Sequence, residues 1–383
     1  MRIFSCKACD QTLFFENTVC LNCQAEVAYL PDIADFVVVP KGVAADAAFE
    51  LELPGKARQR YRRCKNFAAD ACNWIFPVEE QKSSEPEVFC ASCRLTSIIP
   101  DLSNEQHRAA WLEIEQNKRR LLYTLQALAL PVAGKAQEPE TGLTFRFMSD
   151  TEQQKVMTGH SAGVITINVA EANGAFRENL REKLGEGYRT VLGHLRHEIG
   201  HYYWDRLVSG QPALAGFREL FGDEQQSYDE AIQRHYDQGP PADWAESFIS
   251  AYATMHPWED WAETWAHYLH MVDTLETAKS HGLVLRVPGA GAKVVTEGLD
   301  ARDFDEMTRS WRTVTLALNS LNRSMGLKDA YPFVPTEAVQ QKLRFIHELI
   351  RQPRPAPSKE APRSSRAKPR SARAPGEVAA AKG

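Results

Sequence analysis

The sequence predicts an α+β protein that is mainly helical, with a small antiparallel sheet, a cysteine-rich N-terminal module and a disordered basic C-terminal tail. Three observations predict this organisation. All eight cysteines of the 383-residue chain lie between Cys6 and Cys93. Two short β-branched and aromatic runs follow, and most of the remaining chain has apolar residues at helical spacing. A chain of this length is sufficient for about two or three domains.

Residues 1–30 contain two Cys-x-x-Cys pairs, Cys6 with Cys9 and Cys20 with Cys23. Each pair places two thiolates on one tight turn, and two pairs supply the four sulfurs of a tetrahedral zinc site. A module of this size cannot fold on an apolar core alone, so bound metal would provide most of its folding energy. We therefore predict a zinc ribbon. The alternatives are a rubredoxin-like iron site and a redox-active pair, although a redox pair would be expected beside a βαβ pattern, which the sequence lacks.

A second cysteine-containing segment, residues 40–100, carries Cys64, Cys72, Cys90 and Cys93. Only the last two form a Cys-x-x-Cys pair, so the pattern is weaker than in the first module. We favour a second structural zinc site formed by these four thiols. The alternative is that Cys64 and Cys72 are small buried residues. In a reducing compartment, clustered cysteines indicate metal binding more often than disulfides.

The regular elements after the cysteines are predicted from hydrophobic periodicity. A helix is predicted over residues 104–130, where six large apolar residues have helical spacing. The runs "LTFRFMSD" and "GVITINVAEAN" alternate as strands do, and we expect the second to be an edge strand above a binding cleft. Further helices are predicted over the ranges 187–208, 241–278 with an interruption at Pro257, 302–324 and 336–350.

The chain also divides by charge. Residues 351–383 contain nine Lys or Arg and two Glu, a net charge of +7, so the preceding part carries −12 of the total of −5. This tail is rich in Pro, Ala, Arg and Ser and has almost no large apolar residue, which predicts disorder. The first residues lack the apolar region of a secretory signal, and no apolar run is long enough to span a bilayer. We expect a cytoplasmic protein without a membrane partner.

The segment "HLRHEIGHYYWD" carries the strongest chemical pattern of the chain. On a helix, His197 and His201 lie on one face a turn apart and can bind the same metal ion. Glu198 lies one step around the helix, where it can reach an attacking water as a general base without binding the metal. His194 is expected to lie outside the ligand set. The alternative interpretation is an ordinary amphipathic helix with chance histidines.

A catalytic zinc has three protein ligands and an open position, and no third histidine follows His201 at metzincin spacing. A carboxylate from "HPWEDWAETWAHYLH" is the alternative. In one interpretation Glu259 binds the metal and Glu263, a turn later, hydrogen-bonds a ligand histidine from outside. In the other, these residues form an exposed polar flank. Five residues could stabilise an oxyanion, and the sequence does not choose among Tyr252, His256, His267, Tyr268 and His270.

The residues Glu259, Ala262 and Glu263 spell an E-x-x-A-E pattern that resembles the second helix of gluzincin peptidases. This resemblance implies that Glu259 is the third ligand, with Glu263 as the alternative. Together with "CKAC", "CLNC", "FCASCRLTSIIPDLS" and "RTVLGHLRHEIGHYYWDRLV", the pattern resembles a bacterial family of zinc-binding metallopeptidases with an N-terminal zinc ribbon. The resemblance extends to about residue 350 and implies a zincin-like metallopeptidase domain over residues 101–350.

Two functions from different classes are consistent with these patterns. The first is a zinc metallopeptidase that acts on a protein or peptide, with one catalytic and one or two structural zinc ions and Glu198 as the general base. The second is a non-catalytic binding or regulatory protein on a zincin-like scaffold, whose ribbon and basic tail bind nucleic acid. A basic tail is more often a solubilising appendage, so we favour the first function.

Overall fold

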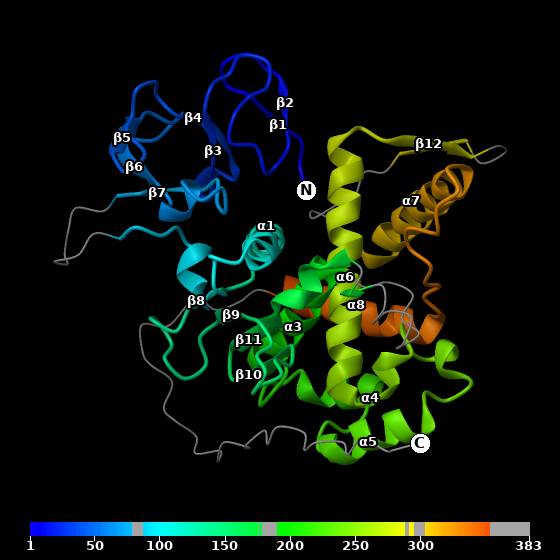
Figure 1. Ribbon diagram of the computed structural model, residues 1–383. Coiled ribbons are helices and arrows are strands. Elements are labelled where there is room, and N and C mark those ends of the chain that lie inside the picture. The colour runs from blue at the N-terminus through cyan, green and yellow to red at the C-terminus, as the bar shows by residue number, and fades with distance from the viewer. Residues whose placement is uncertain (79–86, 175, 178–189, 288–290, 295–302, 353–383) are drawn as a thin grey trace.

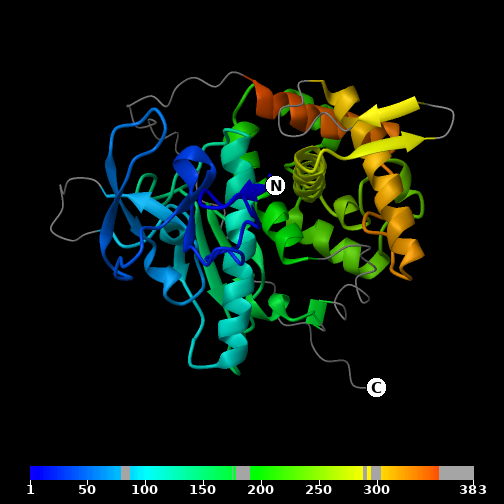
Figure 2. The same ribbon diagram turned by 90° about the horizontal axis from the view of Figure 1, so that it is seen from above.

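The computed structural model describes residues 1–78, 87–174, 176–177, 190–287, 291–294 and 303–352. The predicted tail therefore lies outside the described residues, apart from its first two positions. Helix α1 (Glu105–Ala127) lies between the N-terminal strands on one side and the helices of the remaining chain on the other (Figures 1 and 2). A continuous hydrophobic core joins the two sides across this helix.

The N-terminal part consists of small antiparallel sheets. Strand β1 (Phe4–Ser5) pairs with β2 (Thr12–Leu13), and β3 (Val27–Leu30) pairs with β4 (Asp35–Val38). A three-stranded sheet follows, made of β5 (Ala48–Leu51), β6 (Gln59–Arg63) and β7 (Ile75–Pro77). Strands this short cannot form a stable sheet on apolar contacts alone. We therefore expect the cysteine clusters beside them to contribute to the stability of this part of the fold.

The central sheet is mixed, which corrects our expectation of a small antiparallel sheet at this place. Its order is β10 (Gly159–Ser161), β11 (Val164–Asn168), β9 (Thr144–Met148) and β8 (Thr96–Ile98). Strand β11 is antiparallel to β10 but parallel to β9, and β9 is parallel to β8. The two predicted strands run parallel because the unpredicted β10 reverses the chain between them. Our expectation of the edge strand was also wrong, because β10 forms the edge and β11 is internal.

The predicted helix over 104–130 is confirmed as α1. It begins after Asn104, whose side chain accepts hydrogen bonds from the backbone N–H groups of Gln106 and His107, as an N-cap does. Its predicted apolar side chains are all buried, namely Trp111, Ile114, Leu121, Leu122, Leu125 and Leu128. Strands β9 and β11 contribute buried Phe and Ile residues to the same core.

Two long helices dominate the rest of the chain. Helix α3 (Val191–Leu207) begins after Thr190, whose hydroxyl accepts a hydrogen bond from the backbone N–H of Gly193 at 2.9 Å. Helix α6 (Pro257–Ser280) crosses the centre of the molecule (Figure 1). The predicted helix over 241–278 was therefore wrong in its first half. Residues 241–256 instead form irregular turns with two short 3-10 helices. Helix α6 begins at Pro257, because proline fits the first position of a helix but not its interior.

The remaining elements complete the helical side. Helices α4 (Leu214–Phe221) and α5 (Tyr228–Gln238) were not predicted from the sequence. The two predicted C-terminal helices are present as α7 (Phe304–Ser324) and α8 (Glu337–Arg351), and a hairpin of β12 (Val284–Val287) and β13 (Gly291–Val294) precedes them. Among the helices that the structure describes, none combines the length and apolar character needed to cross a membrane.

Candidate metal centre and active site

Three side chains from α3 and α6 meet where the two helices pack together. Glu259 Oε2 lies 2.9 Å from His197 Nε2 and 3.5 Å from His201 Nε2. Two atoms bound at 2.0–2.1 Å in a tetrahedral zinc site lie about 3.3 Å apart, so these separations fit a shared ion. Two imidazoles and one carboxylate are also a donor set that catalytic zinc prefers. All three side chains are almost fully buried.

Hydrogen bonds from neighbouring elements orient two of these three side chains. Glu263, one turn after Glu259 on α6, lies 2.7 Å from His197 Nδ1 with one carboxylate oxygen and accepts a hydrogen bond of 2.6 Å from the Ser250 hydroxyl with the other. The second oxygen of Glu259 accepts a hydrogen bond of 2.9 Å from the Tyr228 hydroxyl of α5. Such outer contacts fix the rotamer of a ligand and the tautomer of a histidine.

Burial and charge shift the pKa values of these groups in opposite directions. Burial alone would lower the pKa of His197, but its hydrogen bonds to Glu259 and Glu263 outweigh burial and raise that pKa well above its usual value. Burial would raise the pKa of Glu263, but the hydrogen bond to His197 lowers it to about 2. His201 has no carboxylate on Nδ1 among the described residues. The His201 ring is fixed by packing, since its centre lies 3.7 Å from the centre of the Trp258 ring.

Glu198 differs from the other two acids of the site. Its side chain is 7% exposed, and its Oε2 atom has no hydrogen-bond partner among the described residues. Burial raises the pKa of this carboxyl group to about 8. A carboxylate whose pKa is raised in this way is a better proton acceptor than an ordinary glutamate. Glu198 directly follows His197 on α3 and lines the same cavity, so its carboxylate could accept a proton from a molecule bound there.

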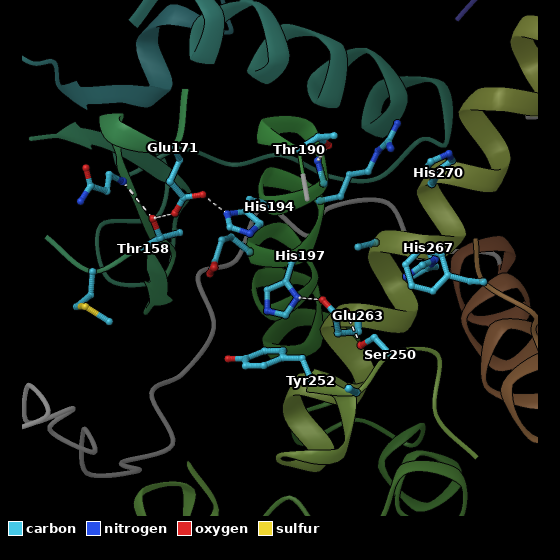
Figure 3. Close-up of a pocket in the computed structure, with 18 of the residues that line it drawn as sticks. Thr158, Glu171, Thr190, His194, His197, Ser250, Tyr252, Glu263, His267 and His270 are labelled. Carbon is cyan, nitrogen blue, oxygen red and sulfur yellow. Dashed lines mark hydrogen bonds and ion pairs between the residues drawn. The ribbon is translucent and has the colours of Figure 1, made fainter. Parts of the chain in front are cut away.

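A cavity of about 420 Å³ opens beside this centre. Its walls include His197 and Glu198 of α3, Glu263 of α6, Tyr252, and Thr158, which directly precedes the edge strand β10. Figure 3 shows Tyr252 next to His197, and their ring centres are 6.0 Å apart. The cavity therefore lies between the two helices and the edge of the sheet, as a peptide-binding cleft would.

Of the five residues named from the sequence for oxyanion stabilisation, three line the cavity and two do not. Tyr252, His267 and His270 line the cavity. His256 instead caps α6, with its Nδ1 accepting a hydrogen bond from the backbone N–H of Trp258 at 3.1 Å. Tyr268 lies away from the cavity, and its hydroxyl is 3.1 Å from His347 Nδ1. The interpretation of α6 as an exposed polar flank was wrong, because Glu259 and His267 are buried and Glu263 and His270 are mostly buried.

Sequence reasoning missed two residues that hydrogen-bond the acids of this centre, Tyr228 to Glu259 and Ser250 to Glu263. Both lie in the region between α3 and α6 for which the sequence has no recognisable spacing, so no local pattern could have placed them. Sequence reasoning also placed His194 outside the ligand set, at a second-sphere or surface position. The residue lies outside the cluster of His197, His201 and Glu259. Its Nδ1 is paired with Glu171, and it lines the cavity (Figure 3).

The cysteines form two clusters. The first consists of Cys6, Cys9, Cys20 and Cys23 and the second of Cys64, Cys72, Cys90 and Cys93, and in each the sulfurs lie within 4.8 Å of one another. The Sγ–Sγ distance is 3.7 Å for Cys6 and Cys23 and 3.6 Å for Cys72 and Cys90. Sulfurs bound at 2.3 Å in a tetrahedron lie about 3.8 Å apart, whereas a disulfide is about 2.05 Å long. The thiols are free and spaced as structural zinc requires.

These features define a class, that of proteins with a zinc-ribbon head and a helical metallopeptidase-like domain, and the comparisons agree. A model described as "zinc-ribbon domain" matches residues 3–104 and so spans both cysteine clusters. A model described as "Putative zinc-binding metallo-peptidase" matches residues 107–349. The second model covers more than half of the chain, so the chain belongs to the family that it describes.

The relatives extend over almost the whole chain. An uncharacterized protein of Mycobacterium bovis and uncharacterized proteins of two strains of Mycobacterium tuberculosis are each 41% identical to it over 356 residues, 93% of this chain and 97% of the relative. No solved structure matches the chain significantly.

Proposed function

We propose that the protein is a zinc-dependent peptidase whose centre is formed by His197, His201 and Glu259. The observation that carries this proposal is the convergence of the two Nε2 atoms and one carboxylate oxygen at 2.9 and 3.5 Å, beside a cavity that Glu198 also lines. The distances support Glu259 as the third ligand. Glu263 contacts the opposite nitrogen of His197 and so supports the ligand from outside.

Zinc bound at this centre would act as a Lewis acid, which makes a water more acidic and polarises the carbonyl of a peptide bond. Glu198 accepts the proton of the attacking water, since it is buried, lacks a partner for Oε2 and lies next to His197 in the chain. Tyr252 donates a hydrogen bond to the oxygen that gains negative charge, because it stands beside His197 and lines the cavity.

The substrate in this proposal is a polypeptide in an extended conformation. Strand β10 pairs on one side with β11, and among the described residues no strand pairs with its other side. Thr158, directly before β10, lines the cavity. An extended peptide can add to such an edge through main-chain hydrogen bonds, which hold its backbone without selecting a sequence. The edge strand therefore supports cleavage of unfolded protein segments.

The test compares Glu198→Gln with the wild type after loading both with zinc. Hydrolysis of unfolded β-casein is measured by mass spectrometry, together with zinc content. We expect the variant to keep its zinc and lose at least about a hundredfold in rate, because it cannot accept the proton. Glu230→Gln, an exposed change on α5, is the matched control and should cleave normally. A Glu198→Gln protein that retains zinc and full activity would refute the mechanism.

A further inference from the structure

His194 forms a mostly buried pair with Glu171 that the proposed mechanism does not use. His194 Nδ1 contacts Glu171 Oε2 at ion-pair distance, and the two side chains are 19% and 6% exposed. The other carboxylate oxygen accepts a hydrogen bond of 2.5 Å from the Thr158 hydroxyl, which in turn accepts one of 3.1 Å from the backbone N–H of Asn168. The strand edge and the turn after β11 thus hold this histidine in one orientation.

The other ring nitrogen of His194, Nε2, is left for proton transfer rather than for a structural hydrogen bond. Nδ1 is taken by Glu171, and among the described residues no hydrogen bond is made to Nε2. His194, Glu171 and Thr158 all line the cavity that contains His197 and Glu198 (Figure 3). A histidine whose Nδ1–H is held by a carboxylate presents Nε2 as a proton carrier, and the carboxylate compensates the charge of the protonated ring.

The helix places this proton carrier beside the proposed base. His194 and Glu198 are four residues apart on α3, so their side chains lie on the same face one turn from each other. His197, which directly precedes Glu198 in the chain, directs Nε2 to Glu259. A peptide that reaches the centre from the β10 edge would pass the His194–Glu171 pair, because Thr158 lies at that edge and contacts Glu171.

We propose that His194 is a further catalytic residue, the acid that protonates the leaving amine, and that Glu171 is its positioning residue. The inference rests on the proposed function. When the C–N bond breaks, its electron pair stays on nitrogen, and the Nε2 proton of His194 is transferred to that nitrogen. The proton that Glu198 took from the attacking water then restores the protonated ring. The sum is a peptide plus water giving a carboxylic acid and an amine.

The experiment exploits the fact that an amine must be protonated to leave, whereas an alcohol leaves far more readily. The bond in β-casein that the zinc-loaded wild type cleaves fastest is identified first. The surrounding peptide is then made in two forms, one with the natural amide and one with an ester at the scissile bond. Rates on both forms and zinc content are measured for His194→Gln, Glu171→Gln and a control, His281→Gln, which is exposed at the end of α6.

We expect His194→Gln to keep its zinc and lose about a hundredfold or more in kcat/KM on the amide but about tenfold or less on the ester. Glu171→Gln should show the same asymmetry with a smaller loss, and His281→Gln should match the wild type. Equal losses on amide and ester, or loss of zinc from His194→Gln, would overturn the inference while the proposed function stands. A zinc-loaded wild type that cleaves no bond in β-casein would overturn both.

Discussion

Glu259 and Glu263 show how neighbours assign different tasks to identical side chains. They lie one turn apart on α6, yet Glu259 faces the Nε2 atoms of both histidines, whereas Glu263 faces Nδ1 of His197 only. Tyr228 holds the first and Ser250 the second. Because only a lone pair that faces the shared position can bind the ion, the first acid is suited to ligation and the second to fixing the histidine tautomer.

This difference predicts two distinct zinc affinities. Glu259→Gln removes the charged donor and should abolish zinc binding at the centre at micromolar zinc. Glu263→Gln keeps all three donors but weakens the support of His197, so zinc should bind about 10–100-fold more weakly. Competition with a fluorescent chelator measures both affinities. If Glu259→Gln bound zinc as tightly as the wild type and Glu263→Gln did not, Glu263 would be the ligand and Glu259 the supporting residue.

His267 gives a pH prediction that does not depend on the metal ligands. Burial lowers its pKa to about 4, and its Nδ1 lies 2.8 Å from the Tyr331 hydroxyl. In the unfolded chain its pKa is about 6.5. Above pH 6.5 His267 is neutral in both the folded and the unfolded chain, so its proton binding does not change the free energy of unfolding. Below it only the unfolded chain takes up the proton, so the free energy of unfolding falls as the pH falls through this range.

We therefore expect His267→Gln, which keeps a hydrogen-bonding group towards Tyr331, to be less sensitive to acid than the wild type. Between pH 7.5 and 5.5 the wild type should lose about 1 kcal/mol more of its free energy of unfolding than the variant does. Urea unfolding at the two pH values measures the difference. An equal loss in both proteins would mean that His267 is protonated in the folded state.

At the scale of elements, the site depends on how closely α3 and α6 approach. Trp261 Nε1 donates a hydrogen bond of 2.8 Å to the Gly200 carbonyl oxygen, across the helix contact. A Cβ atom added at Gly200 would lie 3.1 Å from Ala262 Cα and 3.2 Å from Trp265 Cβ. Glycine between His197 and His201, the two histidines of the proposed centre, therefore brings the carboxylate of Glu259 within reach of both.

Gly200→Ala tests this close approach. Alanine favours a helix over glycine by about 1 kcal/mol, but overpacking against a backbone atom costs about 1–3 kcal/mol. We expect a net loss of stability and weaker zinc binding, since Glu259 moves away from the histidines. Chemical unfolding and zinc titration measure the two effects. A variant that is more stable and binds zinc normally would show that the helices can separate without affecting the centre.

The same elements show how much the sequence could predict. Helices α1 and α3 have caps and regular apolar spacing, so both were located to within a few residues among the described positions. The chain over 241–256 has helix-forming residues as well, but its turns are fixed by contacts such as that of Ser250 with Glu263, which are distant in sequence. The parallel pairing of β9 and β11 was missed for a similar reason, because the reversing strand β10 has only three residues.

At the scale of the whole molecule, the cysteine-rich part is built into the fold rather than attached to it. Phe15 of the first module packs with its ring centre 4.9 Å from that of Tyr29 and 5.5 Å from that of Tyr123 on α1. Tyr123 in turn donates a hydrogen bond of 2.7 Å to Glu276 near the end of α6. All of the cysteines except the exposed Cys23 belong to, or pack against, the core that includes α3 and α6. A structural role in supporting α3 and α6 therefore fits these modules better than independent binding of a partner.

The most direct measurement is an anomalous X-ray difference map from crystals of the zinc-loaded protein, recorded on both sides of the zinc absorption edge. The account predicts one peak within about 2.0–2.2 Å of His197 Nε2, His201 Nε2 and a Glu259 oxygen, and a peak about 2.3 Å from the four sulfurs of each cysteine cluster. Peaks at the cysteines alone, or a peak held by Glu263 with Glu259 turned away, would contradict the proposed centre.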